Sequence, residues 1–334
     1  MLVLSFMAMM QQKAKNLDIL YYQDQRYYNV EMDRLGEAVT QIALIVNIAQ
    51  IPVHFIVGYL FDAVNTRLVV FIGQTLLIAC IFLFPWGHSL YPGALLFEMG
   101  IAFSSNLSHP PLIVDHVDNR TKGLAFSYSA IAEGIGGIYS SFFVMQIVES
   151  YDLLYGTIVV GATLLLFSLY LLCNLKNTLT LKRERRPPPV RGNCCKRFFH
   201  SMWGAWIFCW SHKAFLLLLV GKIVTNFVIH SGTTSALLWA SKYIYIDDGK
   251  AKAAHSKYLG IASYFDLGLA LMTGLLFDKA GPRFLIVATL GVGGGALMWL
   301  YFVGPLDSIL ALTLQISVGV IANQGSHFIN MTMA

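Results

Sequence analysis

From residue 37 onward, long runs of apolar residues alternate with short polar breaks. A helix needs about 20 predominantly apolar residues to cross a bilayer, and about nine runs approach that length. The predicted spans cover residues 37–61, 68–87, 91–114, 123–148, 152–174, 214–240, 257–277, 284–303 and 306–328. The pattern therefore predicts an all-α polytopic membrane protein with about nine to ten membrane helices.

The first 36 residues do not follow this pattern. Residues 1–10 are apolar but make only about half a membrane span, and residues 11–36 are rich in Gln, Tyr and Asp. The basic start and small-residue cleavage site of a secretory signal are missing. We expect residues 1–36 to form a short apolar stub and a polar extramembrane segment.

A polar connector, residues 175–213, separates two groups of spans. It contains eight Lys and Arg side chains before residue 198 against the single acid Glu184. Because Lys and Arg accumulate on the cytoplasmic side of membrane proteins, we expect this linker to be cytosolic. Residues 37–174 then form an N-terminal helix bundle and residues 214–334 an incomplete C-terminal one.

Composition supports a membrane protein and excludes several functions. Charged residues make up 12% of the chain and hydrophobic residues 56%, whereas soluble domains carry about 25% charged residues. The net charge of +5 is concentrated in the linker and does not indicate nucleic-acid binding. Phosphate-binding loops, metal-ligand spacings and nucleophile motifs are missing from the sequence, so we expect no enzyme, metal or cofactor.

One pattern occurs twice, each time between two predicted spans. The copies are GYLFDAVNTR at 58–67 and GLLFDKAGPR at 274–283, with Gly, Leu, Phe, Asp and Arg in the same register. Each copy predicts a short charged hairpin between membrane helices. The repeat indicates two homologous halves, an arrangement that supports alternating access in transporters.

This pair resembles the signature loop between the second and third helices of each half of the major facilitator superfamily, written loosely as G-x-x-x-D-(R/K)-x-G-(R/K)-(R/K). The second copy keeps Gly274, Asp278, Lys279, Gly281 and Arg283. The first copy keeps Gly58, Asp62 and Arg67, and Asn65 replaces a Gly; Asn tolerates the left-handed turn that this Gly supplies. The resemblance implies two pseudo-symmetric helix bundles, in a member shortened at both ends.

The signature hairpins are candidate gates. Asp62 and Asp278 lie where they can accept hydrogen bonds from the N-terminus of a neighbouring helix. They can also pair with Arg67, Arg120 or Arg283. Contacts of this kind form in one access state and break in the other.

Polar residues inside predicted spans are costly in lipid and therefore are functional candidates. In span 37–61, Asn47, Gln50, His54 and Gly58 follow spacings of three, four and four and share one face. They either line a solute cavity or hold helices together. Glu133 lies ~15 Å from the cytoplasmic end of span 123–148, where a carboxyl can bind and release a proton or form a static ion pair.

The span 214–240, which is helix seven in the order of the family, carries Lys222, Asn226 and His230 at i, i+4 and i+8. Lys222 lies too deep to reach the interface easily, so we expect it to meet an anionic solute or to pair with Asp266 or Glu133. In the family, helices one, four, seven and ten line the central cavity. The resemblance therefore implies that His109 and His327, near the ends of the fourth and tenth helices, lie close to the solute path.

These features predict a secondary active transporter of a small polar or anionic solute, with proton coupling as one reading of Glu133. The lipid bilayer is the other expected partner. The alternative, favoured by the shortened ends and the altered first signature copy, is a transport-inactive relative that serves as a structural or receptor subunit.

Overall fold

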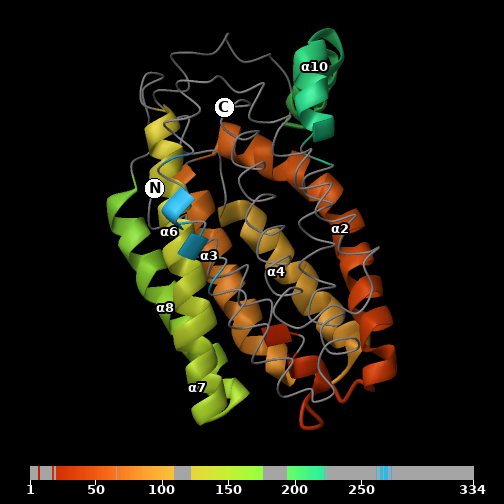
Figure 1. Ribbon diagram of the computed structural model, residues 1–334. Coiled ribbons are helices and arrows are strands. Elements are labelled where there is room, and N and C mark those ends of the chain that lie inside the picture. The colour runs from red at the N-terminus through yellow and green to blue at the C-terminus, as the bar shows by residue number, and fades with distance from the viewer. Residues whose placement is uncertain are drawn as a thin grey trace, which may run out of the picture. The chain divides into compact units, whose positions relative to one another are not determined.

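A computed structural model describes residues 7, 17–18, 20–64, 66–108, 122–175, 194–221, 223, 261, 264–265, 267–269 and 272 (Figure 1). The chain divides into two compact units. The α3 unit comprises Gln11–Asp115 and Gln146–Ser211, and the α6 unit comprises Met1–Met10, His116–Met145 and His212–Ala334.

The α3 unit is built from apolar helices. Its elements are α2 (Met32–Ala63), α3 (Thr66–Leu83), η1 (Phe84–Trp86), η2 (Leu90–Ala94), α4 (Leu95–Ser108), α8 (Leu153–Asn174) and α10 (Cys194–Ser211), together with most of α7 (Met145–Ser150). In this unit α3 contacts α2, α4 and α8. Its buried residues, Thr66, Val69, Val70, Gly73, Gln74, Leu77 and Ile78, recur at spacings of three and four, as expected for one helix face.

Small residues bring the helices of the α3 unit close together. A Cβ atom on Gly100 of α4 would lie 2.7 Å from the Sγ atom of Cys80 on α3. A Cβ atom on Gly161 of α8 would lie 2.5 Å from the Cζ atom of Phe82. Both distances are shorter than any ordinary contact, so glycine at these positions lets neighbouring backbones approach.

The α6 unit contains α6 (Lys122–Ile138) and the π-helical turn η4 (Tyr139–Val144). Gly134, Gly136 and Gly137 of α6 are buried, as expected where small residues allow helices to approach closely. Among the other described residues of this unit, Tyr264 contacts Phe142 with 5.9 Å between ring centroids.

The predicted spans agree well with the described helices. Four helices of the described ranges are long and apolar enough to cross a membrane, Arg34–Phe61, Thr66–Trp86, Ser127–Ser150 and Leu153–Asn174, with a fifth if Phe198–Ser211 and Lys213–Gly221 form one broken span. The four match predictions 37–61, 68–87, 123–148 and 152–174 within a few residues. Prediction 91–114 corresponds to η2 and α4 as far as Ser108.

Two features differ from the apolar pattern. The predicted polar linker contains the 18-residue helix α10. Within the predicted polar segment, Tyr21, Tyr22 and Tyr28 are buried, so this stretch packs against the helices of the α3 unit. The predicted domain boundaries, the pseudo-symmetry of the two halves and the spans beyond residue 223 stay predictions.

Candidate functional site

Three faces run along the middle of α2. The predicted polar residues do share one face: Asn47, His54 and Gly58 are exposed, and Gln50 is half-buried. A second face, with Val46 and Val57, is buried in the unit. The third face is apolar and exposed, and it carries Leu44, Ile48, Ile51 and Phe55. We call the first face the α2 polar arc.

The three faces of α2 suit three different environments. An exposed apolar surface on a membrane helix suits lipid, whereas exposed amide and imidazole groups on a spanning helix suit a water-filled path. Since the α2 polar arc adjoins the buried face, it is the part of α2 best suited to face such a path.

The first signature hairpin is tight. Only Val64 and Asn65 separate α2 from α3, and the amide of Val64 donates to the carbonyl oxygen of Leu60 at 2.8 Å. Thr66 is fully buried and Arg67 half-buried at the start of α3, while Asp62 lies in the last turn of α2. The predicted short connection is confirmed, and the gating role of its residues stays a prediction.

Glu133 is half-buried in the middle part of α6. The hydroxyl of Ser129, one turn earlier, lies at hydrogen-bond distance of its Oε1 atom, 3.5 Å. Ser127, Ser129, Ser140 and Ser141 are buried in the same helical stretch. The carboxyl group of Glu133 therefore sits partly shielded from solvent on a helix rich in hydroxyl groups.

The remaining predicted site residues lie outside the described part of the chain. They are Lys222, Asn226, His230, Asp266, His109 and His327 for the solute path, and Arg120, Gly274, Asp278, Lys279, Gly281 and Arg283 for the gates. Their roles, and the ion pairs proposed for Lys222, stay predictions.

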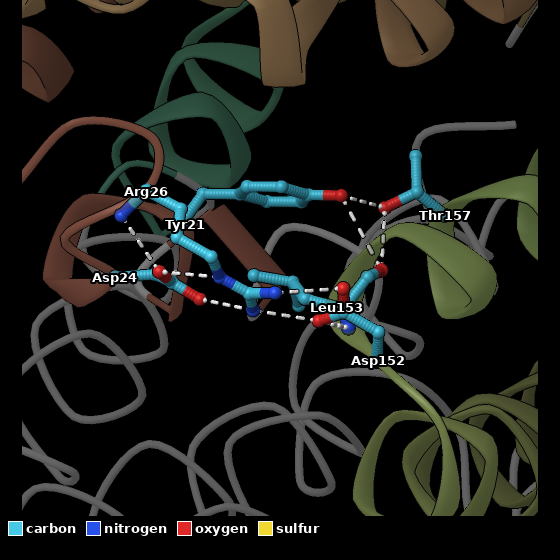
Figure 2. Close-up of polar contacts among 6 residues, drawn as sticks. All are labelled: Tyr21, Asp24, Arg26, Asp152, Leu153 and Thr157. Carbon is cyan, nitrogen blue, oxygen red and sulfur yellow. Dashed lines mark hydrogen bonds and ion pairs between the residues drawn. The ribbon is translucent and has the colours of Figure 1, made fainter.

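One site that the sequence pattern did not reveal joins the segment before α2 to the start of α8 (Figure 2). We call Tyr21, Tyr22, Arg26 and Tyr28 the tyrosine latch. The hydroxyl groups of Tyr21 and Thr157 lie 2.6 Å apart, and Tyr21 also donates to the carbonyl oxygen of Leu153. Tyr28 donates to the carbonyl oxygen of Phe84 in η1, directly after α3 and away from the signature hairpin. The latch thus ties the segment before α2 to α3 and α8.

Burial and charge determine the titration of the latch. Desolvation raises the pKa of Tyr21 and Tyr22, so both hydroxyl groups stay neutral donors at physiological pH. Arg26 forms two hydrogen bonds to the carboxylate of Asp152, 2.7 and 3.0 Å long, and also binds Asp24. The Arg26 guanidinium lowers the pKa of Asp152. The Asp152 carboxylate in turn caps α8 by accepting from the Leu153 amide at 2.7 Å.

The match to a family model is nearly complete along the chain. The model described as Major Facilitator Superfamily matches residues 2–334. The chain belongs to the major facilitator superfamily. It is therefore a multi-pass integral membrane protein of a secondary transporter family rather than an enzyme, as the signature pair predicts.

Solved structures support the fold of this superfamily member. A crystal structure of the peptide transporter POT covers 99% of this chain and 86% of its own, with 13% identity and a TM-score of 0.64. The transporter FucP in the outward conformation has 15% identity and a TM-score of 0.61, and the match covers 99% of this chain and 87% of FucP. The xylose transporter XylE from E. coli, in a partially occluded inward-open conformation, has 13% identity and a TM-score of 0.62. That match covers 99% of this chain and 89% of XylE. A comparison with curated proteins found no sequence match.

A second acidic residue of this superfamily member, Glu98, lies within the predicted span 91–114 and was not among the predicted site residues. Glu98 lies in the first turn of α4 and is half-buried. The hydroxyl of the buried Tyr22 donates to its Oε1 atom at 3.3 Å. The argument that selected Glu133, an acid within an apolar run, also applies to Glu98 and was the available signal.

Proposed function

We propose that this protein moves a small polar or anionic solute across a membrane by alternating access, and that Glu133 couples the movement to protons. The observation that carries the proposal is the α2 polar arc, an exposed polar face next to an exposed apolar one on the same spanning helix. The half-buried Glu133 supplies a group that can exchange a proton. Lys222, Asn226, His230, Asp266, His109 and His327 complete the proposed path.

The sides and gates follow from the same proposal. The basic linker faces the cytosol, since Lys and Arg accumulate there. The signature hairpin with Gly58, Asp62 and Arg67 then closes the cytosolic end of the path, and the residues of the second copy form the matching gate. The tyrosine latch closes the opposite end of the α3 unit.

Uptake by the full chain reconstituted in liposomes tests the proposal. The solutes are a dipeptide, a hexose, a pentose and a monocarboxylate, each with and without an inward proton gradient. We expect accumulation of at least one solute that depends on the gradient. Glu133→Gln should abolish accumulation but keep exchange of labelled for unlabelled solute, because exchange needs no net proton movement.

Glu149→Gln is the matched control, because Glu149 lies exposed in α7. We expect it to leave both accumulation and exchange unchanged. Accumulation that survives Glu133→Gln contradicts the proton role. The transport-inactive alternative predicts that folded protein neither takes up nor exchanges any of the solutes. It also predicts that Glu133→Gln and Lys222→Ala leave the function of the protein in the cell unchanged.

A further inference from the structure

The helix α10 touches the rest of the α3 unit along a narrow line. Its contact partner is α2, where the rings of Phe198 and Tyr59 lie 5.5 Å apart. Phe198, Met202 and Cys209 are half-buried and recur at spacings of four and seven, which marks the face turned to the unit. Every other described side chain of α10 is exposed.

The side of α10 next to this face carries an exposed stripe of large aromatic side chains. Phe199, Trp203, Trp206 and Trp210 follow spacings of four, three and four, and their exposed fractions are 68%, 64%, 58% and 61%. The stripe is about 16 Å long at the rise of an α-helix, and the rings of Trp206 and Trp210 lie 5.9 Å apart. Half of the six tryptophans in the chain lie in this one helix. A continuous aromatic surface of this kind marks an interaction site.

Charge indicates what covers the aromatic stripe. Lys196 is exposed at the start of α10, and the sequence just before it is rich in Lys and Arg. The helix itself contains no Asp or Glu, so a second copy of α10 would bring like charges together. An anionic lipid surface matches both properties, because tryptophan prefers the headgroup level of a bilayer and basic residues attract anionic headgroups.

The basic end also argues against a helix that crosses the bilayer alone. Lys196, Arg197 and His200 fall within the first seven residues of α10, and ionisable groups are costly in the hydrocarbon region. A helix lying in the interface keeps this end in the headgroups and still buries the aromatic stripe.

We propose that α10 is an interfacial membrane anchor that binds the surface of a leaflet containing anionic lipid through its aromatic stripe and basic N-terminal end. The anchor holds the linker against the membrane beside the end of α2 that leads into the first signature hairpin. The solute and its coupling play no part in this proposal, so the two can fail independently.

Quenching of tryptophan fluorescence by brominated lipids tests the anchor in the full chain. One variant combines Trp86→Phe, Trp239→Phe and Trp299→Phe, so that its tryptophan fluorescence comes from α10 alone. It is placed in nanodiscs of phosphatidylcholine with a fixed fraction of brominated phosphatidylserine or brominated phosphatidylcholine. We expect brominated phosphatidylserine to quench the fluorescence at least about twofold more strongly than brominated phosphatidylcholine. This preference should be lost in Lys196→Gln and in 1 M salt, which screens the attraction between charges.

The position of the bromine atoms reports depth. We expect bromines near the headgroup to quench α10 more than bromines near the bilayer centre. The matched control keeps only Trp86, which is also 64% exposed but lies in η1, beyond the end of α3 that is about 27 Å by helix rise from the signature hairpin. Trp86 should show no preference for the serine lipid.

Three results would overturn the anchor: equal quenching by the two lipids, stronger quenching from the bilayer centre, or quenching by aqueous iodide alone. Should the multiple-Phe variants not fold, the unsubstituted protein is compared with a variant carrying Trp206→Phe and Trp210→Phe. The part of the quenching lost in that variant then reports α10. If this α10 quenching is the same with the brominated serine lipid and with brominated phosphatidylcholine, the proposal is contradicted as well.

Discussion

Two regions of the α3 unit, the tyrosine latch and the α2 polar arc, handle polar groups in opposite ways. In the tyrosine latch, the hydroxyl groups of Tyr21, Tyr22 and Tyr28 are buried and hydrogen-bonded. In the α2 polar arc, Asn47 and His54 lie exposed on a helix that is otherwise apolar on that side. Buried and paired groups stabilise a fold, whereas exposed polar groups on a spanning helix remain available to a solute. The difference separates residues that hold the unit together from those suited to transport.

The largest expected effect concerns the α2 polar arc. Because their side chains are exposed, Asn47→Leu combined with His54→Leu should lower solute uptake at least about tenfold, equivalent to about 1.4 kcal/mol, without a change in the unfolding midpoint in detergent. Ile48→Leu combined with Phe55→Leu, in the apolar face of the same helix, is the matched control and should leave uptake intact. A loss of stability that parallels the loss of uptake would instead make the arc a packing surface.

Substitutions of two glycines compare the packed interface between α3 and α8 with the exposed α2 polar arc. Gly161→Ala should lower the free energy of unfolding by about 1–3 kcal/mol, because the new methyl group collides with the ring of Phe82. Around Gly58 a Cβ atom meets nothing within 4 Å. Gly58→Ala should therefore raise stability by up to about 1 kcal/mol, since alanine favours the helix. Thermal unfolding of both variants measures the difference, and equal effects would contradict it.

A smaller effect is expected in the latch. Tyr21→Phe removes the hydrogen bond to Thr157 and should lower the free energy of unfolding by about 1 kcal/mol. The hydroxyl of Thr157 keeps its bond to the carbonyl oxygen of Leu153, which limits the loss. Tyr151→Phe is the control, because Tyr151 is 76% exposed. Identical unfolding curves for the two variants would show that the buried hydroxyl adds no stability.

The smallest effect is expected at the exposed clamp between Arg26 and Asp152. The pKa of Asp152 is lowered in the folded protein by the Arg26 guanidinium. Its contribution to stability is therefore complete above the ordinary carboxyl pKa of about 3.9 and is lost as the pH falls through the lowered value. Arg26→Gln should therefore reduce this acid dependence, lowering stability slightly between pH 5 and 8 and leaving it unchanged at a pH below the lowered pKa, since an exposed ion pair contributes little. Parallel acid unfolding profiles for Arg26→Gln and the unsubstituted protein would contradict the prediction.

Much of the fold follows from local apolar patterns, and the latch shows where those patterns stop being informative. Runs of about 20 apolar residues suffice to place α2, α3 and α8. The spacing of Asn47, Gln50, His54 and Gly58 also predicts their common face correctly. The burial of Tyr21 depends on Thr157, which lies 136 residues away in sequence. Long-range packing of this kind leaves no periodic signal near Tyr21 itself.

The linker shows a different limit of the sequence pattern. Its excess of Lys and Arg predicts a side of the membrane but conceals the helix α10, since charge and proline content dominate the stretch before it. The spacing of Phe199, Trp203, Trp206 and Trp210 was the available signal for a helix. Glu98 was missed for another reason: its partner Tyr22 comes from a segment that composition marks as polar.

The bond between Tyr21 and Thr157 also has a consequence for biogenesis. At about 5–20 residues per second, a ribosome needs roughly 7–27 s to make the 136 residues between these partners. During that interval α2 and α3 are synthesised while Tyr21 has neither Thr157 nor the Leu153 carbonyl to bind. The α3 unit therefore completes its assembly only after α8 has left the ribosome.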